Sequence, residues 1–135
     1  MRVVLDANVV ASGVCWRGES YLCLVKLARR QALAYATDYT LAETRETATR
    51  LIRERCPKNN AANVMSWYLQ QVRILHPTVL GKQRSRDAKD DPYLAAALAA
   101  RANYVVSYDK DLLVLEKPFG IEIIRPAHFL RLVKG

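Results

Sequence analysis

Short, mostly apolar runs without a helical period recur along the chain. Such runs are typical of strands that are buried on both faces of a parallel sheet. They lie at residues 2–6, 32–37, 72–76, 103–107 and 120–126. The first run, "RVVLD", ends in an aspartate. A carboxylate taken out of water needs a turn to cap, a cation or a metal, so this residue is a candidate for a functional role.

Between these runs, apolar residues recur at the spacing of helices that face a core. This pattern predicts helices at residues 19–31, 39–55, 59–71, 93–102, 109–116 and 127–133. Pro92 suits the first turn of its helix, and the alanines on every side of that helix indicate tight burial. The segment "GKQRSRDAKDD", residues 81–91, is polar almost throughout and is expected to form a loop.

The alternation of strands and helices predicts an α/β fold in which helices cover both faces of a parallel sheet. A length of 135 residues fits one domain, which we expect to span residues 1–135. In open sheets of this kind the functional site lies at the carboxyl ends of the strands. Asp6 and Asp109 each follow a predicted strand and are therefore expected at that edge.

Charge and composition narrow the class of protein. The formal net charge of +8 makes nucleic acid the first partner to consider, although basic residues that serve only solubility would give the same value. No apolar run approaches the roughly 20 residues that cross a bilayer, so we expect no membrane contact and a cytoplasmic location. Cys15, Cys23 and Cys56 lack metal-ligand spacing and are expected to be reduced thiols.

Four places in the chain supply carboxylates that belong to the same edge of the predicted sheet. They are Asp6, Glu43 in the first turn of its helix, the pair Asp90 and Asp91, and Asp109. Taken singly, each suits a turn, a helix cap or a solvated helix position. Together they would repel one another unless a divalent cation neutralised them, and oxygen ligands without histidine or cysteine select Mg²⁺ or Mn²⁺.

Basic residues flank these acids in the sequence. Arg45, Arg50 and Arg53 follow Glu43, and a second basic run leads into Asp90. That second run contains Lys82, Arg84, Arg86 and Lys89. Cations that collect a nucleic-acid backbone beside a metal site suit phosphodiester hydrolysis, although either run could also be a solvated face.

Several segments together resemble the PIN domain, in the branch of VapC-like toxin components of bacterial toxin–antitoxin pairs. The segments are "VVLDANVVASG", "TLAETRE", "RDAKDDPYLAAALAARANYVVSYDKDLL" and "IEIIRPAHFL". The resemblance implies a three-layer α/β/α sandwich and a magnesium- or manganese-dependent ribonuclease. It places the catalytic and metal-binding acids at Asp6, Glu43, Asp90 and Asp109, with Asn8 and Ser107 as supporting polar groups. It also implies RNA as substrate, a homodimer and a cognate antitoxin protein.

Two other functions and one ambiguity stay open from the sequence. An inactive PIN fold would serve as an RNA-binding or protein-interaction module. An aspartyl-nucleophile phosphatase would have an aspartate two residues after the first one, where this chain has Asn8. Of the doubled acids, helix geometry and the resemblance both favour Asp90 as the ligand, with Asp91 expected to point to solvent or to cap the helix.

Overall fold

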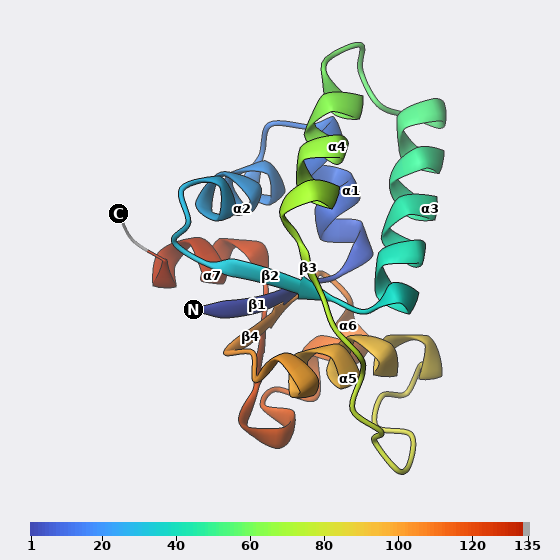
Figure 1. Ribbon diagram of the computed structural model, residues 1–135, viewed down its shortest axis with the longest axis vertical. Coiled ribbons are helices and arrows are strands. Elements are labelled where there is room, and N and C mark those ends of the chain that lie inside the picture. The colour runs from blue at the N-terminus through green and yellow to red at the C-terminus, as the bar shows by residue number, and fades with distance from the viewer. Residues whose placement is uncertain (134–135) are drawn as a thin grey trace.

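A computed structural model describes residues 1–133 and has a five-stranded parallel sheet at its centre (Figure 1). The strand order is β3-β2-β1-β4-β5. The strands are β1 (Arg2–Leu5), β2 (Leu33–Ala36), β3 (Arg73–Ile74), β4 (Tyr104–Val106) and β5 (Glu122–Ile124). Each of the five predicted strands is present, in shorter form. All neighbouring pairs are parallel, as the alternation of strands and helices predicted.

Helices connect the strands. They are α1 (Ala7–Cys15), α2 (Glu19–Ala28), α3 (Asp38–Glu54), α4 (Ala61–Gln71), α5 (Asp91–Ala100), α6 (Lys110–Leu113) and α7 (Pro126–Leu132), with 3₁₀ turns η1 (Ala88–Asp90) and η2 (Pro118–Gly120). Six of these helices match predicted ones, whereas α1 was not predicted. Within residues 1–133, the helices are too short or too polar to cross a membrane.

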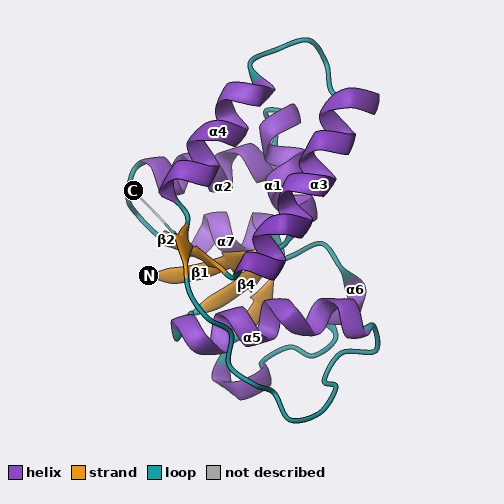
Figure 2. Ribbon diagram, turned by 45° about the vertical axis from the view of Figure 1, so that its right-hand side comes forward, coloured by secondary structure: helices purple, strands orange, loops and turns teal. Residues whose placement is uncertain are grey.

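The helices form two layers, one on each face of the sheet (Figure 2). Alternate side chains of β1 separate the two cores, because Val3 and Leu5 pack with α1, α2 and α7, whereas Val4 packs with α5 and α6. Helices α3 and α4 lie outside α1 on the same face as α2. The predicted three-layer α/β/α fold is therefore confirmed.

Helix α1 follows β1 after a single residue, and its burial explains why the sequence pattern did not reveal it. Seven of its nine residues are buried, and its polar face is a narrow strip made of Asn8 and Ser12, so its mostly apolar sequence resembles that of a buried strand. Its glycine also serves packing. A Cβ at Gly13 would lie 2.9 Å from Leu24 Cδ1 and 3.0 Å from the carbonyl oxygen of Ser20, so glycine lets α1 approach α2 closely.

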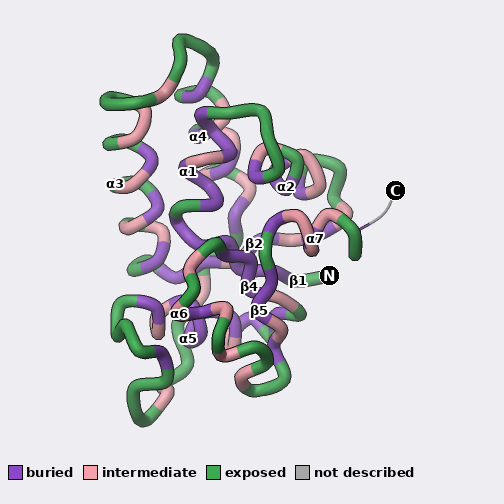
Figure 3. The backbone as a smooth tube through the Cα atoms, turned by 180° about the vertical axis from the view of Figure 1, so that it is seen from behind, coloured by how far each residue is buried: buried purple, intermediate pink, exposed green. Residues whose placement is uncertain are grey.

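Burial is uneven around the carboxyl edge of the sheet. In Figure 3 the strands β1, β4 and β5 and helix α1 are mostly buried, whereas the long connection between β3 and α5 is mostly exposed. This connection includes the polar segment that was predicted to be a loop. Val79 within it is 90% exposed. The edge where the predicted acids lie is thus bordered by an exposed basic loop.

Candidate acidic site at the carboxyl edge of the sheet

Asp6 lies at the junction of β1 and α1, where its backbone is fixed by both elements. Its N–H donates to the carbonyl of Val106 on β4 at 3.0 Å, and its own carbonyl accepts from Val9 at 3.0 Å. The carboxylate is 5% exposed and accepts a hydrogen bond from the Ser107 hydroxyl at 2.7 Å. Burial raises the pKa of Asp6, and the nearby carboxylates of Asp109 and Glu43 raise it further. A buried acid is therefore held close to two others.

Glu43 enters the same edge from α3. Because α3 begins at Asp38, Glu43 lies in the second turn of the helix and not in the first, as the sequence had suggested. Thr37 caps the helix by accepting the N–H of Thr40 at 3.2 Å. The Tyr93 hydroxyl of α5 donates a hydrogen bond to Glu43. Burial raises the pKa of Tyr93, and Glu43 raises it further, so this hydroxyl stays a donor.

The doubled acids before α5 have different surroundings. Asp90 is 7% exposed and accepts a hydrogen bond from the Ser85 hydroxyl at 3.3 Å. Burial raises the pKa of Asp90 to about 7, and the neighbouring carboxylates of Asp109, Asp87 and Asp6 add to the effect. Asp91 was expected to point to solvent or to cap the helix. Its side chain is half-exposed and does not cap the helix.

Instead, Asp91 fixes the basic loop. It accepts the backbone N–H groups of Arg84 at 2.8 Å and Ser85 at 2.7 Å. A short polar side chain can replace missing backbone partners in this way because it reaches back to exposed amides of the same segment. Asp91 therefore positions the loop that carries Ser85, while Asp90 faces the other acids.

Asp109 follows β4 and caps the short helix α6. Its carboxylate accepts the N–H of Asp111 at 2.8 Å, and its own N–H donates to the Ser107 hydroxyl at 2.9 Å. The Ser107 hydroxyl thus hydrogen-bonds both to the Asp6 carboxylate and to the backbone N–H of Asp109. The negative charge of Asp109 raises the pKa of both Asp6 and Asp90.

Two further acids at this edge were missed by the sequence reasoning. Among the described residues, Asp87, Asp90 and Asp111 form a group of three whose carboxylate oxygens all lie within 4.8 Å of one another. Asp6, Glu43 and Asp109 stand outside this group. A signal for the missed residues was present, because Asp87 is in the same loop as Asp90 and Asp111 is two residues after Asp109. Arg86 pairs with Asp111 at 2.8 Å.

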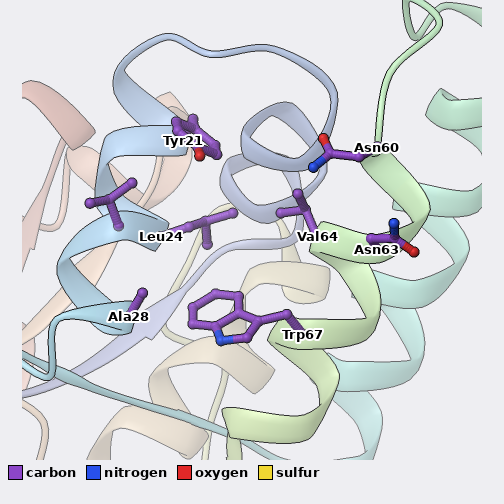
Figure 4. Close-up of a pocket in the computed structure, with 8 residues that line it drawn as sticks. Tyr21, Leu24, Ala28, Asn60, Asn63, Val64 and Trp67 are labelled. Atoms are coloured by element: carbon purple, nitrogen blue, oxygen red, sulfur yellow. The ribbon is translucent and has the colours of Figure 1, made fainter.

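Asn8, the other supporting residue implied by the resemblance, is exposed and lines a cavity of about 420 Å³ beside Glu43. Arg50 and Lys89 line the same cavity, which is mostly polar. A separate cavity of about 300 Å³ lies between α2 and α4 (Figure 4). In Figure 4, Trp67 of α4 faces Leu24 and Ala28 of α2, so that cavity is lined mainly by apolar groups. None of the predicted acids lines it.

The donor set at the acidic edge fits a divalent cation. The candidate ligands are all carboxylates, which suit hard ions such as Mg²⁺ and Mn²⁺. Burial is the main cause of the raised pKa of Asp90, and the negative charges of Asp109, Asp87 and Asp6 raise it further. Arg86 supplies one positive charge at Asp111, but its side chain is 65% exposed, so solvent weakens its effect.

Comparison with known proteins gives one result. A search of curated proteins found no match. A family model described as the PIN domain matches residues 2–111. This match covers most of the chain, including all seven acids described above and the parallel sheet from β1 to β4. The chain therefore belongs to the PIN domain family.

Proposed function

We propose that this protein is a divalent-metal-dependent endoribonuclease. PIN domains are generally metal-dependent nucleases, and this chain has a group of three acids at the edge of the sheet, of which Asp90 is buried. The observation that carries the proposal is the convergence of carboxylates on Asp90. Asp90 is buried, and the negative charges of Asp109, Asp87 and Asp6 raise its pKa in addition to the effect of burial. The alternative is an inactive module. A module that only binds would gain nothing from this costly arrangement.

In the proposed site, Asp6, Asp90 and Asp109 hold Mg²⁺ or Mn²⁺, and Glu43 is a further ligand or orients the attacking water. A bound divalent ion supplies a water of lowered pKa and stabilises charge on the phosphate. The protein's own hydroxyl groups set the geometry. Ser107 orients the Asp6 carboxylate, and Tyr93 orients that of Glu43.

The surroundings of the acids support a nucleic-acid substrate. Arg50 and Lys89 line the same cavity as Glu43, so a phosphate that approaches this acid meets two cations. Lys82 lies on the adjacent loop. These cations reduce the repulsion between the substrate backbone and the acids, which a metal ion neutralises only in part.

The biological role is proposed on the resemblance alone. In this proposal the protein is the toxin of a toxin–antitoxin pair, acts in the cytoplasm on RNA, forms a homodimer and is silenced by a cognate antitoxin protein. A small acidic-tailed DNA-binding protein encoded next to this gene would support the pairing. If its co-expression left the ribonuclease activity unchanged, the toxin–antitoxin assignment would fail.

The function is tested with Asp6→Asn. Asparagine keeps the shape of the side chain and an acceptor for Ser107 but removes the charge. Cleavage of single-stranded RNA in Mn²⁺ should fall by at least about 100-fold, because loss of metal-ion stabilisation worth several kcal/mol corresponds to two or more factors of ten. EDTA should abolish cleavage by the parent protein.

The matched control is Asp38→Asn, which changes an exposed aspartate in the first turn of α3. It should cleave RNA like the parent. Asp6→Asn should also melt no lower than the parent, because burial already disfavours the charged form of Asp6. RNA binding without metal-dependent cleavage in the parent would favour the inactive module.

A further inference from the structure

Tyr39 is an exposed aromatic residue at the mouth of the candidate site. It is the second residue of α3, two residues after the Thr37 cap, and is 57% exposed. Tyr93, by contrast, is 1% exposed and is used to hold Glu43. Neither the core nor the acid chemistry accounts for a large aromatic ring at this exposed position.

Two cavities meet at Tyr39. On one side is the polar cavity that contains Glu43, Arg50 and Lys89. On the other side is a mainly apolar cavity of about 530 Å³, which lies between the start of α3, the exposed loop and the start of α5. Its walls include Pro77, Val79, Leu80, Pro92 and Ala95. Tyr39 lines both cavities and is therefore shared by a charged space and an apolar one.

The chemistry of the two cavities matches the two halves of a nucleotide. The polar cavity is lined by two cations, Arg50 and Lys89, which attract a phosphate, and by two carboxylates, Glu43 and Glu46. The apolar cavity has a volume in the range of small-molecule sites, and its walls are mainly apolar, with Lys82 and Asp91 as the charged residues among them. A flat, uncharged ring fits the apolar part of such walls, and Lys82 adds a positive charge beside it. An unpaired base that leaves its stack is commonly held against an aromatic side chain.

Resting on the proposed function, we propose that Tyr39 stacks on an unpaired base of single-stranded RNA. The base occupies the apolar cavity, and the adjoining phosphate lies in the polar cavity between Arg50 and Lys89. Tyr39 thereby places one nucleotide beside the acids. The site takes unpaired RNA, since a base that remains in a duplex cannot enter the cavity.

The test is a double-mutant cycle, in which the Tyr39 side chain and single bases of the RNA are removed separately and together and the RNA affinity is measured. Tyr39→Ala and Tyr39→Phe are compared with the parent by fluorescence anisotropy of a short single-stranded RNA, in EDTA at low salt. The same RNA is then used with an abasic nucleotide at each position in turn. Tyr21→Ala is the matched control, because Tyr21 lines the cavity between α2 and α4 (Figure 4).

Tyr39→Ala should weaken binding by about 5- to 150-fold, the range for loss of one stacked base, while Tyr39→Phe and Tyr21→Ala stay within about twofold. At one position, removal of the base should weaken binding by the parent by a similar factor but hardly affect Tyr39→Ala. Equal losses in parent and variant at every position would overturn the proposal. They would assign the surface to another occupant, such as an apolar segment of a protein partner.

Cleavage of the same RNA in Mn²⁺ separates this inference from the proposed function. Cleavage by the parent without base coupling at Tyr39 would refute only the stacking. Base coupling without cleavage would keep the stacking and refute the nuclease. Absence of RNA binding by the parent, even at low salt, would overturn the stacking proposal whatever the cleavage result.

Discussion

The acidic edge has two sides that differ in how their charge is controlled. On the Asp6 side, Asp6 and Glu43 each accept a hydrogen bond from a buried hydroxyl, that of Ser107 or Tyr93. On the Asp90 side, Asp90 also accepts a hydrogen bond from a buried hydroxyl, that of Ser85, but here three acids crowd together. Asp87, Asp90 and Asp111 place carboxylate oxygens within 4.8 Å of one another, and a solvent-exposed arginine is the ion-pair partner of Asp111. Neutral donors fix geometry without cancelling charge. The Asp6 side is therefore preorganised, whereas the Asp90 side depends most on a bound cation.

The largest expected effect is that of Asp90→Asn, because it removes the acid on which the others converge. Cleavage of RNA at saturating Mg²⁺ should fall by at least about 100-fold. Asp91→Asn is the matched control. It should keep more than about a tenth of the activity and instead lower the melting temperature, since it weakens the contacts to the amides of Arg84 and Ser85. The reverse order would move the ligand to Asp91.

The next effect is on stability, through metal and pH. The folded-state pKa of Asp90 is raised from 3.8 to about 7, so the folded protein binds the proton more tightly than the unfolded chain does. Without metal, the free energy of unfolding should therefore fall as pH rises from about 4 to about 7. The raised pKa of Asp6 acts in the same direction.

Mn²⁺ should reverse this loss at neutral pH. At 100 times its dissociation constant it adds about 2.7 kcal/mol, which is on the order of 5–10 °C in melting temperature for a domain of this size. Thermal denaturation at pH 5 and pH 7, with and without Mn²⁺, measures both effects. A metal-free protein that becomes more stable up to pH 7, or that ignores millimolar Mn²⁺, would contradict a shared carboxylate site. Asp90→Asn should flatten the pH dependence.

The smallest effect separates Arg86 from Lys82 in the basic loop. Arg86 pairs with Asp111, so Arg86→Ala should tighten Mn²⁺ binding by about two- to fivefold, in line with the small energies of exposed ion pairs. Lys82→Ala should leave Mn²⁺ binding unchanged and reduce the salt dependence of RNA binding by a slope of about 0.7. Calorimetry with Mn²⁺ and salt titration of RNA binding measure these changes. Equal Mn²⁺ affinities in both variants would remove Arg86 from the electrostatics of the site.

The sequence predicted those elements that show a regular spacing of apolar residues or are bounded by a helix-breaking residue. Pro92 and the alanines that follow it predicted α5, and the short apolar runs predicted the strands. Helix α1 was missed because "ANVVASGVC" is apolar on nearly every side. Periodicity reports only the contrast between faces, so an element with so narrow a polar face gives little such signal.

For the candidate site, the sequence predicted at which edge of the sheet the acids would lie. It did not predict which acids would contact one another and which would hold the loop. Parallel strands bring Asp6 and Asp109 to the same edge of the sheet whatever the loops do, and the charge of Asp109 raises the pKa of Asp6. The roles of Asp91 and Asp111 depend on the path of an irregular loop, which has no period to read. The hydroxyl of Tyr93 was missed because its position on α5 reads as core, and its partner Glu43 lies 50 residues earlier in the chain.

The backbone hydrogen bond between Asp6 and Val106 means that the site can form only late in synthesis of the chain. The N–H of Asp6 has its partner on β4, and the Ser107 hydroxyl that orients the carboxylate comes one residue later. A nascent chain adds residues in order, so β1 can pair with β2 early, but about a hundred residues must follow β1 before its other neighbour, β4, emerges from the ribosome. Until Asp109 and Asp111 have left the exit tunnel, these two acids are not available to the site. A partial product released by premature termination before Val106 therefore lacks this site.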